Sequence, residues 1–266
     1  MPIPNYPNKL KAQAMFSAMD LLKHQRTTGI FSDYINPEGV IFTYQPSLIH
    51  AIGRIHRLKK VKSFFGDCYQ VKERGTRIAI LGHFGIGAPV SVVLLEQYAA
   101  LGARKFVLVG MAGGLQPGMQ AGELVVCDRA LRDEGTSYHY LEPTKYVEAS
   151  SELTEQLKAR LEDLTSNYIV GPSWTTDAPF RETDEEVEIY QKEGMQTVEM
   201  EAAALFAAGH SLGLQVAAAF SIGDTLLVPE NGTNPGSRWR LDFNFQKTLQ
   251  GLVILAQAAI RCLTDG

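Results

Sequence analysis

Residues 78–109 read IAILGHFGIGAPVSVVLLEQYAALGARKFVLV, and this stretch decides the fold class. Its apolar run Ile78–Leu81 predicts a buried strand, and a glycine-rich turn follows. The apolar stretch Val90–Leu101 then predicts a helix, and Lys105–Val109 predicts a second strand. A strand–helix–strand unit brings the second strand back parallel to the first. The sequence therefore predicts an α/β fold with at least partly parallel pairing.

Apolar patterns along the rest of the chain continue this alternation. Further strands are predicted at 40–44, 123–127, 168–170 and 216–222. Pro46 is predicted to open a helix lined by Ile49, Ile52 and Ile55, and Leu153, Leu157, Leu161 and Leu164 mark the face of another. Thr183 and Glu186 have the spacing of a capping box. The last helices are predicted at Ala202–Leu212, closed by Gly213, and at Leu241–Leu263.

The N-terminal part of the chain is predicted to be a helical extension. Ala14, Met15, Ala18, Met19 and Leu22 form one apolar stripe at helical spacing, and Gly29 is predicted to end that helix. No internal repeat, low-complexity tract or linker interrupts the sequence. We therefore expect a single domain over residues 1–266, with residues 1–39 as an extension packed on it.

The composition argues against nucleic acid or a membrane as partner. Lys plus Arg (25) nearly balance Asp plus Glu (29), so the net charge is only -4 and no basic surplus favours nucleic acid. The apolar stretch 251–260 is shorter than the roughly 20 residues of a membrane span. Three widely spaced cysteines fit reduced thiols. We expect a cytoplasmic protein with neither disulfides nor a metal site.

Two glycine-rich segments follow neighbouring strands and could let a ligand approach the backbone. The first is 82–89, which includes His83, Phe84 and Gly85; the second is 110–114, a predicted turn that includes Ala112 and Gly113. In open α/β sheets, ligands bind beyond the carboxyl ends of strands. The first segment lacks the Lys-Ser/Thr of a phosphate-binding P-loop. ATP and NAD are therefore poor candidates, and tight packing alone could also explain such turns.

Three acidic residues follow the later strands. Glu199 and Glu201 come at a strand-to-helix junction, where acids are often favoured only by the helix dipole. Glu201 precedes a run of alanines, so a carboxylate fixed there could also accept hydrogen bonds from paired sugar hydroxyls. Asp224 follows the buried strand 217–222 and could be an ordinary turn residue. In a partly desolvated cleft, it could instead hold a proton for a leaving group.

The order and spacing of these segments resemble the nucleoside phosphorylase superfamily. This superfamily includes purine nucleoside phosphorylase, uridine phosphorylase and methylthioadenosine/S-adenosylhomocysteine nucleosidase. Residues 85–89 are similar to its Gly-Ile-Gly-Gly-Pro loop, 110–117 to its Gly-Thr/Ser-Ala/Thr-Gly-Gly-x-x-Pro turn, and 121–126 to its Val-Gly-Asp strand entry. Residues 198–203, Val-Glu-Met-Glu-Ala-Ala, match its most diagnostic motif closely.

The resemblance implies a three-layer α/β/α sandwich around a twisted mixed, largely parallel sheet. It also implies a homo-oligomer, a dimer or a hexamer, that acts on a small-molecule nucleoside without metal or organic cofactor. Glu201 would bind the ribose 2′- and 3′-hydroxyls, Met200 would pack against the sugar, and Asp224 would protonate a purine at N7. Trp174 occupies what resembles the base-stacking position. Further candidate substrate contacts are Glu199, Phe180, Ala112, Gly113, His83, Phe84 and Gly85.

The sequence departs from the family at the phosphate site. Where the family has Gly-Asp-x-x-Arg after its first strand, residues 44–48 read Tyr-Gln-Pro-Ser-Leu. Leu108 replaces a second family arginine, and Met111 replaces the threonine that contacts phosphate. Charge-assisted donors to a dianion are therefore missing at these positions. The uracil-reading Gln-x-Arg of uridine phosphorylase has no counterpart in 180–183, and the nucleosidase glutamate near the first strand has none either.

Three functions therefore stay open. The first is a nucleoside phosphorylase, acting on purine nucleosides or secondarily on pyrimidine nucleosides, with phosphate as co-substrate. The second is a nucleosidase that uses water, which the missing arginines favour. The third is a nucleoside-binding protein that has kept the ribose pocket but lost catalysis.

Overall fold

A computed structural model describes residues 6, 8–28, 35–72, 75, 77–226, 239–240 and 244–264. Its strands are β1 (Gly39–Thr43), β2 (Leu58–Val61), β3 (Asp67–Val71), β4 (Ile78–Gly82), β5 (Lys105–Gly114), β6 (Leu124–Asp133), β7 (Tyr146–Glu148), β8 (Ile169–Thr176), β9 (Thr197–Glu199), β10 (Gln215–Leu226) and β11 (Trp239–Arg240). Its α-helices are α1 (Ala18–Thr27), α2 (Pro46–Ile52), α3 (Ala88–Ala100), α4 (Ser151–Glu162), α5 (Asp184–Lys192), α6 (Ala202–Leu212) and α7 (Phe245–Thr264). Short 3-10 turns lie at Lys9–Lys11, Ser137–His139 and Pro179–Arg181.

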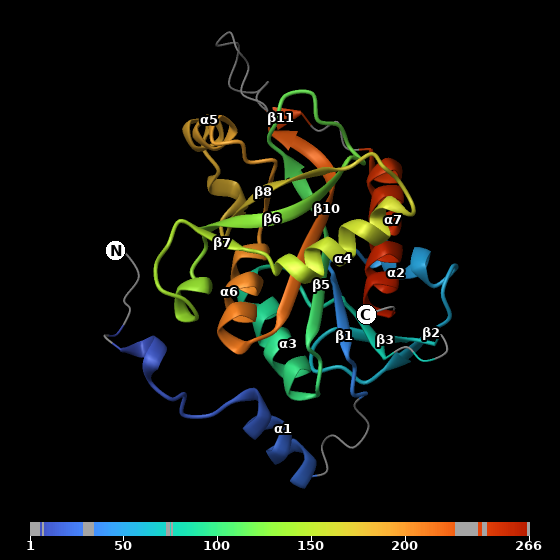
Figure 1. Ribbon diagram of the computed structural model, residues 1–266, viewed down its shortest axis with the longest axis vertical. Helices are drawn as coiled ribbons and strands as arrows, with labels where there is room; N and C mark the ends of the chain where they lie inside the picture. The colour runs from blue at the N-terminus through green and yellow to red at the C-terminus, as the bar shows by residue number, and fades with distance from the viewer. Residues whose placement is uncertain are drawn as a thin grey trace.

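All of these strands belong to one sheet, part of which closes on itself. The pairing order is β11-β10-β6-β8-β9-β5-β1-β4-β3-β2, with β7 added to β6. Strand β10 also pairs with β5, so β10, β6, β8, β9 and β5 form a ring of five strands. Figure 1 shows the long strands β5 and β10 running side by side through the middle of the molecule. The remaining strands extend from this ring as an open sheet.

The sheet is mixed and its centre is parallel, as the sequence predicts. The strands at its centre, β4, β1, β5 and β10, pair in parallel, and so do β6 with β8 and β8 with β9. The other six pairings between the described strands are antiparallel. The antiparallel neighbours are short and come from the hairpins at the edge of the sheet and from the closure of the ring.

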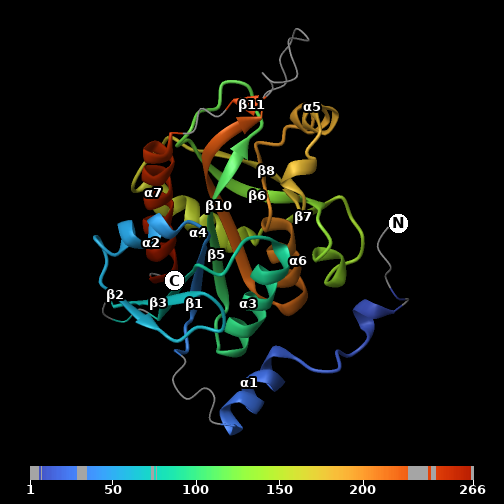
Figure 2. The same ribbon diagram turned by 180° about the vertical axis from the view of Figure 1, so that it is seen from behind.

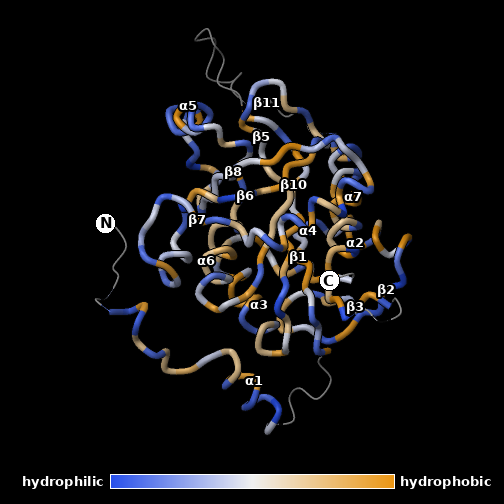
Figure 3. The backbone as a smooth tube through the Cα atoms, in the orientation of Figure 1, coloured by the Kyte–Doolittle hydropathy of each residue, from blue (hydrophilic) through white to orange (hydrophobic). Residues whose placement is uncertain are grey.

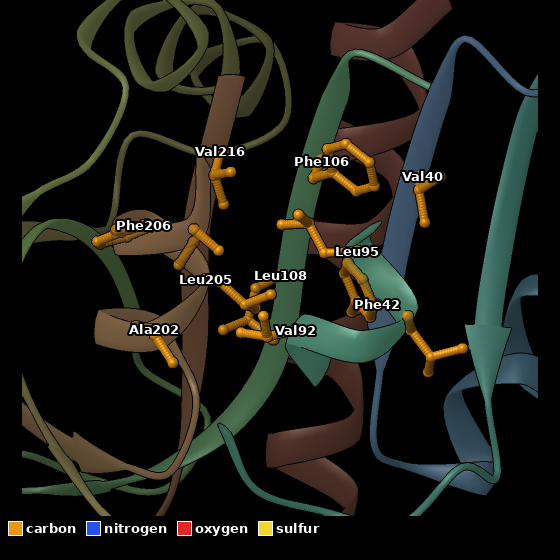
Figure 4. Close-up of a cluster of buried hydrophobic side chains, with 14 of the residues drawn as sticks. Val40, Phe42, Val92, Leu95, Phe106, Leu108, Ala202, Leu205, Phe206 and Val216 are labelled. Carbon is orange, nitrogen blue, oxygen red and sulfur yellow. The ribbon is translucent and has the colours of Figure 1, made fainter. Parts of the chain in front are cut away.

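Helices cover the sheet on both sides, which confirms the predicted three-layer α/β/α architecture. Helices α3 and α6 pack together on one side, with α1 against α3, and α2 and α4 pack around α7 on the other (Figure 1 and Figure 2). Figure 4 shows the first of these cores, where Val92 of α3 and Leu205 of α6 meet Leu108 of β5. In Figure 3 the hydrophobic colour follows β10, which contributes alternate residues to the cores on both sides.

Several boundaries differ from those that the sequence predicts. Helix α1 begins at Ala18, after a Ser17/Asp20 capping box, so the stripe does not start at Ala14; Met15 is fully exposed. Helix α2 ends at Ile52, and Ile55 lies beyond it with 52% of its surface exposed. The hairpin of β2 and β3 was not predicted, since its first strand is lysine-rich and has no fully buried residue. Gly29 and Leu241, the predicted end and start of helices, lie outside the described residues.

Other local sequence signals predicted helix starts and ends correctly. Pro46 occupies the first turn of α2, the Thr183/Glu186 capping box opens α5, and Gly213 ends α6 in the left-handed conformation with φ 66. Leu22 of α1 is buried, and α1 contacts α3. That the chain forms one domain stays a prediction. The three cysteines are buried thiols. In the described part of the chain no helix combines the length and apolarity that a membrane crossing needs.

Helix α6 provides a test of this packing. Phe206 is 1% exposed between α6 and the sheet, whereas Leu212 at the end of the same helix is 45% exposed. We expect Phe206→Ala to lower the free energy of unfolding by about 3–5 kcal/mol. The control Leu212→Ala should change it by about 0.5 kcal/mol. Urea denaturation followed by circular dichroism measures both, and equal losses in the two variants would contradict the described packing of α6.

Candidate active site

The carboxyl ends of β5, β9 and β10 bring the predicted acids to one edge of the sheet. Gly113 of β5 is the register partner of both Asp224 of β10 and Val198 of β9, the residue before Glu199. Asp224 and Val198 therefore flank Gly113 on either side, two strand spacings or roughly 10 Å apart. The two segments that the sequence predicted to converge, 198–201 and 224, do lie at the same place.

A β-bulge places Asp224 in this position. The pairing of β10 with β5 shifts register between Ile222 and Asp224, so Gly223 has no partner on β5. A Cβ atom on Gly223 would collide with the side chain of Met111, which would have to shift to make room for it. Bulges of this kind re-aim side chains and are frequent beside active sites. Residues 110–114, predicted as a turn, are in fact the end of β5, because β9 and β10 pair with them.

A partly open cavity of about 520 Å³ lies against these strand ends. This volume is in the range of small-molecule sites. One wall comes from the segment before α5 and its first turns, namely Pro179, Phe180, Glu182, Thr183, Asp184 and Val187. The other comes from the strands and the segment after β9, namely Met111, Ala112, Gly113, Val198, Glu199, Met200, Asp224 and Leu226. Of the predicted substrate contacts, Asp224, Glu199, Met200, Phe180, Ala112 and Gly113 meet here.

Glu199 anchors the start of α6. One carboxyl oxygen accepts the N–H of Glu201 at 2.7 Å and of Ala202 at 2.8 Å, and the other accepts the hydroxyl of Thr175 at 2.5 Å. The helix-dipole interpretation of this acid therefore holds, since it satisfies the first N–H groups of a helix. Burial raises the pKa of Glu199, and these hydrogen bonds oppose the rise.

Glu201 is the N-cap residue of α6 and points toward the glycine loop between β4 and α3. Its Oε1 atom accepts the N–H of Gly87 at 2.6 Å, and the residue is 6% exposed. Its side chain does not line the 520 Å³ cavity, which begins at the neighbouring Met200. Burial, and secondly the charge of Glu199, raise the pKa of Glu201 to about 8. At neutral pH these two neighbouring carboxyl groups therefore hold a proton.

The loop 82–87 presents a backbone N–H to Glu201, not side chains to the cavity. Gly85 and Gly87 have φ of 95 and 102, which favour glycine, and His83 adopts a positive φ of 56. The His83 Nδ1 atom lies 3.0 Å from Asp67 on β3, and Phe84 is 8% exposed and packs edge-on against Phe42 and Tyr44. None of His83, Phe84 and Gly85 lines the cavity, so their predicted substrate contacts have no support in its geometry.

Tyr44 and Ser91 hold this loop in place, and the sequence analysis missed their role. The Tyr44 hydroxyl lies 2.7 Å from the Ser91 Oγ atom, which donates to the carbonyl of Gly87 at 2.9 Å. Because the Ser91 hydroxyl donates its hydrogen to the Gly87 carbonyl, the Tyr44 hydroxyl is the donor in the bond between Tyr44 and Ser91. Burial, and secondly Glu201, raise the pKa of Tyr44. Tyr44 begins the stretch 44–48, which differs from the family's Gly-Asp-x-x-Arg.

Trp174 and Phe180, both predicted to contact the substrate, lie in different environments. Trp174 is 1% exposed, and its ring N–H donates to the Asp133 carboxylate at 2.9 Å. Its ring packs on the ring of Tyr190, with 4.7 Å between the ring centroids. It does not line the cavity and packs in a core cluster, so this geometry favours the alternative interpretation of Trp174 as an ordinary core residue. Phe180 is 99% exposed on the cavity wall and has a free aromatic face. Residue type could not separate these two aromatic residues. Their positions could, because Trp174 lies in a strand of the sheet and Phe180 lies in a turn.

The match to known proteins agrees with this geometry. A family model described as the phosphorylase superfamily matches residues 54–261. The chain therefore belongs to the phosphorylase superfamily, as the sequence motifs indicate. The structure is similar to a crystal structure of uridine phosphorylase from Vibrio fischeri, with a TM-score of 0.72 and 28% identity, covering 86% of this chain and 92% of that one.

Curated relatives include enzymes named for different nucleosides. Guanosine phosphorylase of Halorubrum lacusprofundi is 34% identical over 54% of this chain and 60% of its own length. Uridine phosphorylase of Thermococcus kodakarensis is 31% identical over 47% and 49%. A DeoD-type purine nucleoside phosphorylase of Caldanaerobacter subterraneus is 25% identical over 69% and 76%. The chain thus matches only about half to three-fifths of the length of the first two.

The raised pKa of Glu201 gives a testable pH dependence of stability. Its ordinary value is 4.5 and its value in the folded protein is about 8, so the folded state binds this proton more tightly than the unfolded chain. Its contribution is complete below pH 4.5 and is lost as the pH rises to 8, with a slope approaching about 1.4 kcal/mol per pH unit. Urea denaturation between pH 5 and 8 should show this decline in the wild type and a flatter profile in Glu201→Gln. The exposed Glu188→Gln should keep the wild-type slope, and a flat wild-type profile would contradict the shift.

Proposed function

We propose that this protein cleaves the N-glycosidic bond of a nucleoside, with purine nucleosides preferred. The observation that carries the proposal is the placement of Asp224 and the 198–201 segment on either side of Gly113, at the rim of one cavity. Sugar hydroxyls need a fixed acceptor, and Glu201 keeps lone pairs for them beyond the one that Gly87 uses. A departing base needs a proton donor, which Asp224 supplies from the other side.

The proposed reaction proceeds by dissociation. The C1′–N9 bond breaks with its electron pair moving to the purine, while C1′ gains oxocarbenium character. Asp224 gives its proton to N7, so the base leaves as a neutral molecule, and an acceptor oxygen forms the new bond to C1′. Proton donation of this kind contributes about 10²–10⁴-fold to the rate. The remaining lone pairs of Glu201 hold the 2′- and 3′-hydroxyls throughout.

Phosphate is the acceptor that the family favours, because the relatives named above are phosphorylases. The products would then be the free base and ribose 1-phosphate. Pyrimidine nucleosides remain a secondary substrate class, given the uridine phosphorylases among the similar proteins. The expected homo-oligomer and the cytoplasmic location stay predictions.

Water is a second candidate acceptor, and one observation favours it. Among the described residues, no Lys or Arg lines the cavity, whereas four carboxyl groups do. Leu108 is 1% exposed in the core between α3 and α6 (Figure 4), and Met111 packs over Gly223. A phosphate dianion beside Glu199 and Glu201 would meet repulsion without a compensating cation from these residues. Water carries no such cost.

Removing either acid should abolish turnover without unfolding the protein. We expect Asp224→Asn to reduce kcat for purine nucleosides about 10²–10⁴-fold, because the leaving base is no longer protonated. Glu201→Gln should raise KM as well as lower kcat, since it weakens the hold on the sugar. Base release from inosine, adenosine and guanosine measures both effects, with the exposed Asp163→Asn as control. Turnover near wild type in either variant would refute the assignment of that residue.

A second assay decides between the acceptors. The protein is incubated with inosine, adenosine, guanosine, uridine and methylthioadenosine, with and without phosphate, and free base is followed. The first candidate predicts release only with phosphate, and the second predicts release regardless of it. Binding of a nucleoside without any release of base would contradict both and identify a binding protein that has lost catalysis.

A further inference from the structure

Tyr44 is a polar residue beside the candidate site that the proposed reaction does not use. It directly follows β1, and because β1, β5 and β10 run parallel, it lies at the same edge of the sheet as the acids of the site. Its ring packs edge-on against Phe84, with 5.1 Å between the ring centroids. Its hydroxyl donates to the Ser91 Oγ atom at 2.7 Å. Both ends of this side chain are therefore held by neighbours of the glycine loop.

Gly87 is the point where the contacts of Tyr44 and Glu201 meet. Its carbonyl accepts the Ser91 hydroxyl at 2.9 Å, and its N–H donates to the Glu201 Oε1 atom at 2.6 Å. The first backbone bond of α3, from the Ser91 N–H to the same carbonyl, is longer at 3.4 Å. A continuous series of hydrogen bonds therefore leads from the Tyr44 hydroxyl to the carboxyl group that is proposed to hold the sugar.

Side-chain packing does little to hold the glycine loop. Gly87 has a φ of 102, where only glycine is at ease and where the backbone has other conformations within reach. Among the described residues, a Cβ atom built on Gly87 would meet only Pro89 within 4 Å, and one on Gly85 would meet nothing. Ile86, between the two glycines, is 64% exposed. A segment with so few packing contacts depends on its hydrogen bonds for its orientation.

We propose that Tyr44 is a positioning residue for the sugar, which fixes the Glu201 carboxyl in the direction of the ribose hydroxyls. It acts through Ser91 and Gly87, and the inference rests on the proposed function because it takes Glu201 as the sugar-binding group. An acceptor that is already fixed loses less conformational freedom on binding than a mobile one, so the hold on the 2′- and 3′-hydroxyls is stronger. Burial, and secondly Glu201, raise the pKa of Tyr44, so its hydroxyl remains a neutral donor at physiological pH.

The proton on Glu201 reports on this arrangement even without a ligand. Burial, and secondly the charge of Glu199, raise the pKa of Glu201 to about 8. Hydrogen bonds from the backbone of Gly87 and Met200 act in the opposite direction. If Gly87 turns away, the ionised form of Glu201 loses a donor, and its pKa rises further. The folded state then keeps the proton to a higher pH, so the decline of stability that begins near pH 4.5 continues above pH 8.

The test compares the wild type with Tyr44→Phe, which keeps the ring that packs on Phe84 and removes only the hydroxyl. Ser91→Ala removes the next group in the series, and a double variant combines both changes. The matched control is Tyr168→Phe, which removes a hydroxyl that donates to Glu162 at 2.8 Å, outside the cavity lining. Dissociation constants for inosine, guanosine and their 2′-deoxy counterparts are measured by calorimetry, with base release in parallel. Urea denaturation is followed across the pH range on both sides of pH 8.

We expect Tyr44→Phe to weaken the binding of inosine and guanosine by the same factor, about 2–10-fold, which corresponds to one lost hydrogen bond. The 2′-deoxy nucleosides lack one of the hydroxyls that Glu201 is proposed to hold, so their loss should be smaller. Ser91→Ala should have the same effect as Tyr44→Phe, and the double variant should add little to either. In all three variants the decline of stability should continue above pH 8. Tyr168→Phe should match the wild type in binding and in its pH profile.

The outcomes separate this inference from the proposed function. Wild-type affinities and an unchanged pH profile in Tyr44→Phe, with base release intact, would overturn the role of Tyr44 and leave the function standing. A loss that Ser91→Ala does not share would mean that Tyr44 contacts the ligand directly, which also overturns the inference. Equal losses for ribonucleosides and 2′-deoxynucleosides overturn it too, as does a wild type that binds none of them. The expected changes in binding and pH profile without any release of base would support the inference and overturn the catalytic proposal.

Discussion

The hydrogen bonds that Glu199 accepts are the interaction on which the site depends. They join the first N–H groups of α6 to Thr175 of β8 at the point where β9 ends. Because a helix N-terminus favours negative charge, the same contact offsets part of the cost of burying the acid. This anchor fixes the direction in which Glu201 leaves the helix, and Gly87 then holds its carboxyl from the other side.

Most of the fold could be predicted from the sequence because its signals are local. The apolar runs of β1, β4 and the first half of β10 are buried at nearly every position, and such runs mark central strands. Capping residues such as Thr183 and Gly213 fixed helix ends for the same reason. The motif at 198–203 indicated the family, and the register across Gly113 brings this segment and Asp224, the predicted acids of the candidate site, to the same strand ends.

What the sequence could not predict depends on long-range pairing. Residues 110–114 look like a glycine-rich turn, and only their pairing with β9 and β10 makes them strand. The role of Tyr44 requires contacts with Ser91 and Gly87 that its neighbours in sequence do not reveal. Trp174 and Phe180 were assigned by residue type, whereas burial decides which of them a ligand can touch.

One wall of the cavity is built on the closed ring of β5, β9, β8, β6 and β10, and the other wall lies outside this ring. Each strand of the ring is bonded on both sides, so an insertion or a slip in one of them would have to be accommodated by all five. The segment 179–187 lies outside the ring and carries no such constraint. Substitutions before α5 can therefore change the shape of the cavity without disturbing the strand ends. This arrangement gives a physical reason why one scaffold can supply enzymes for several nucleosides.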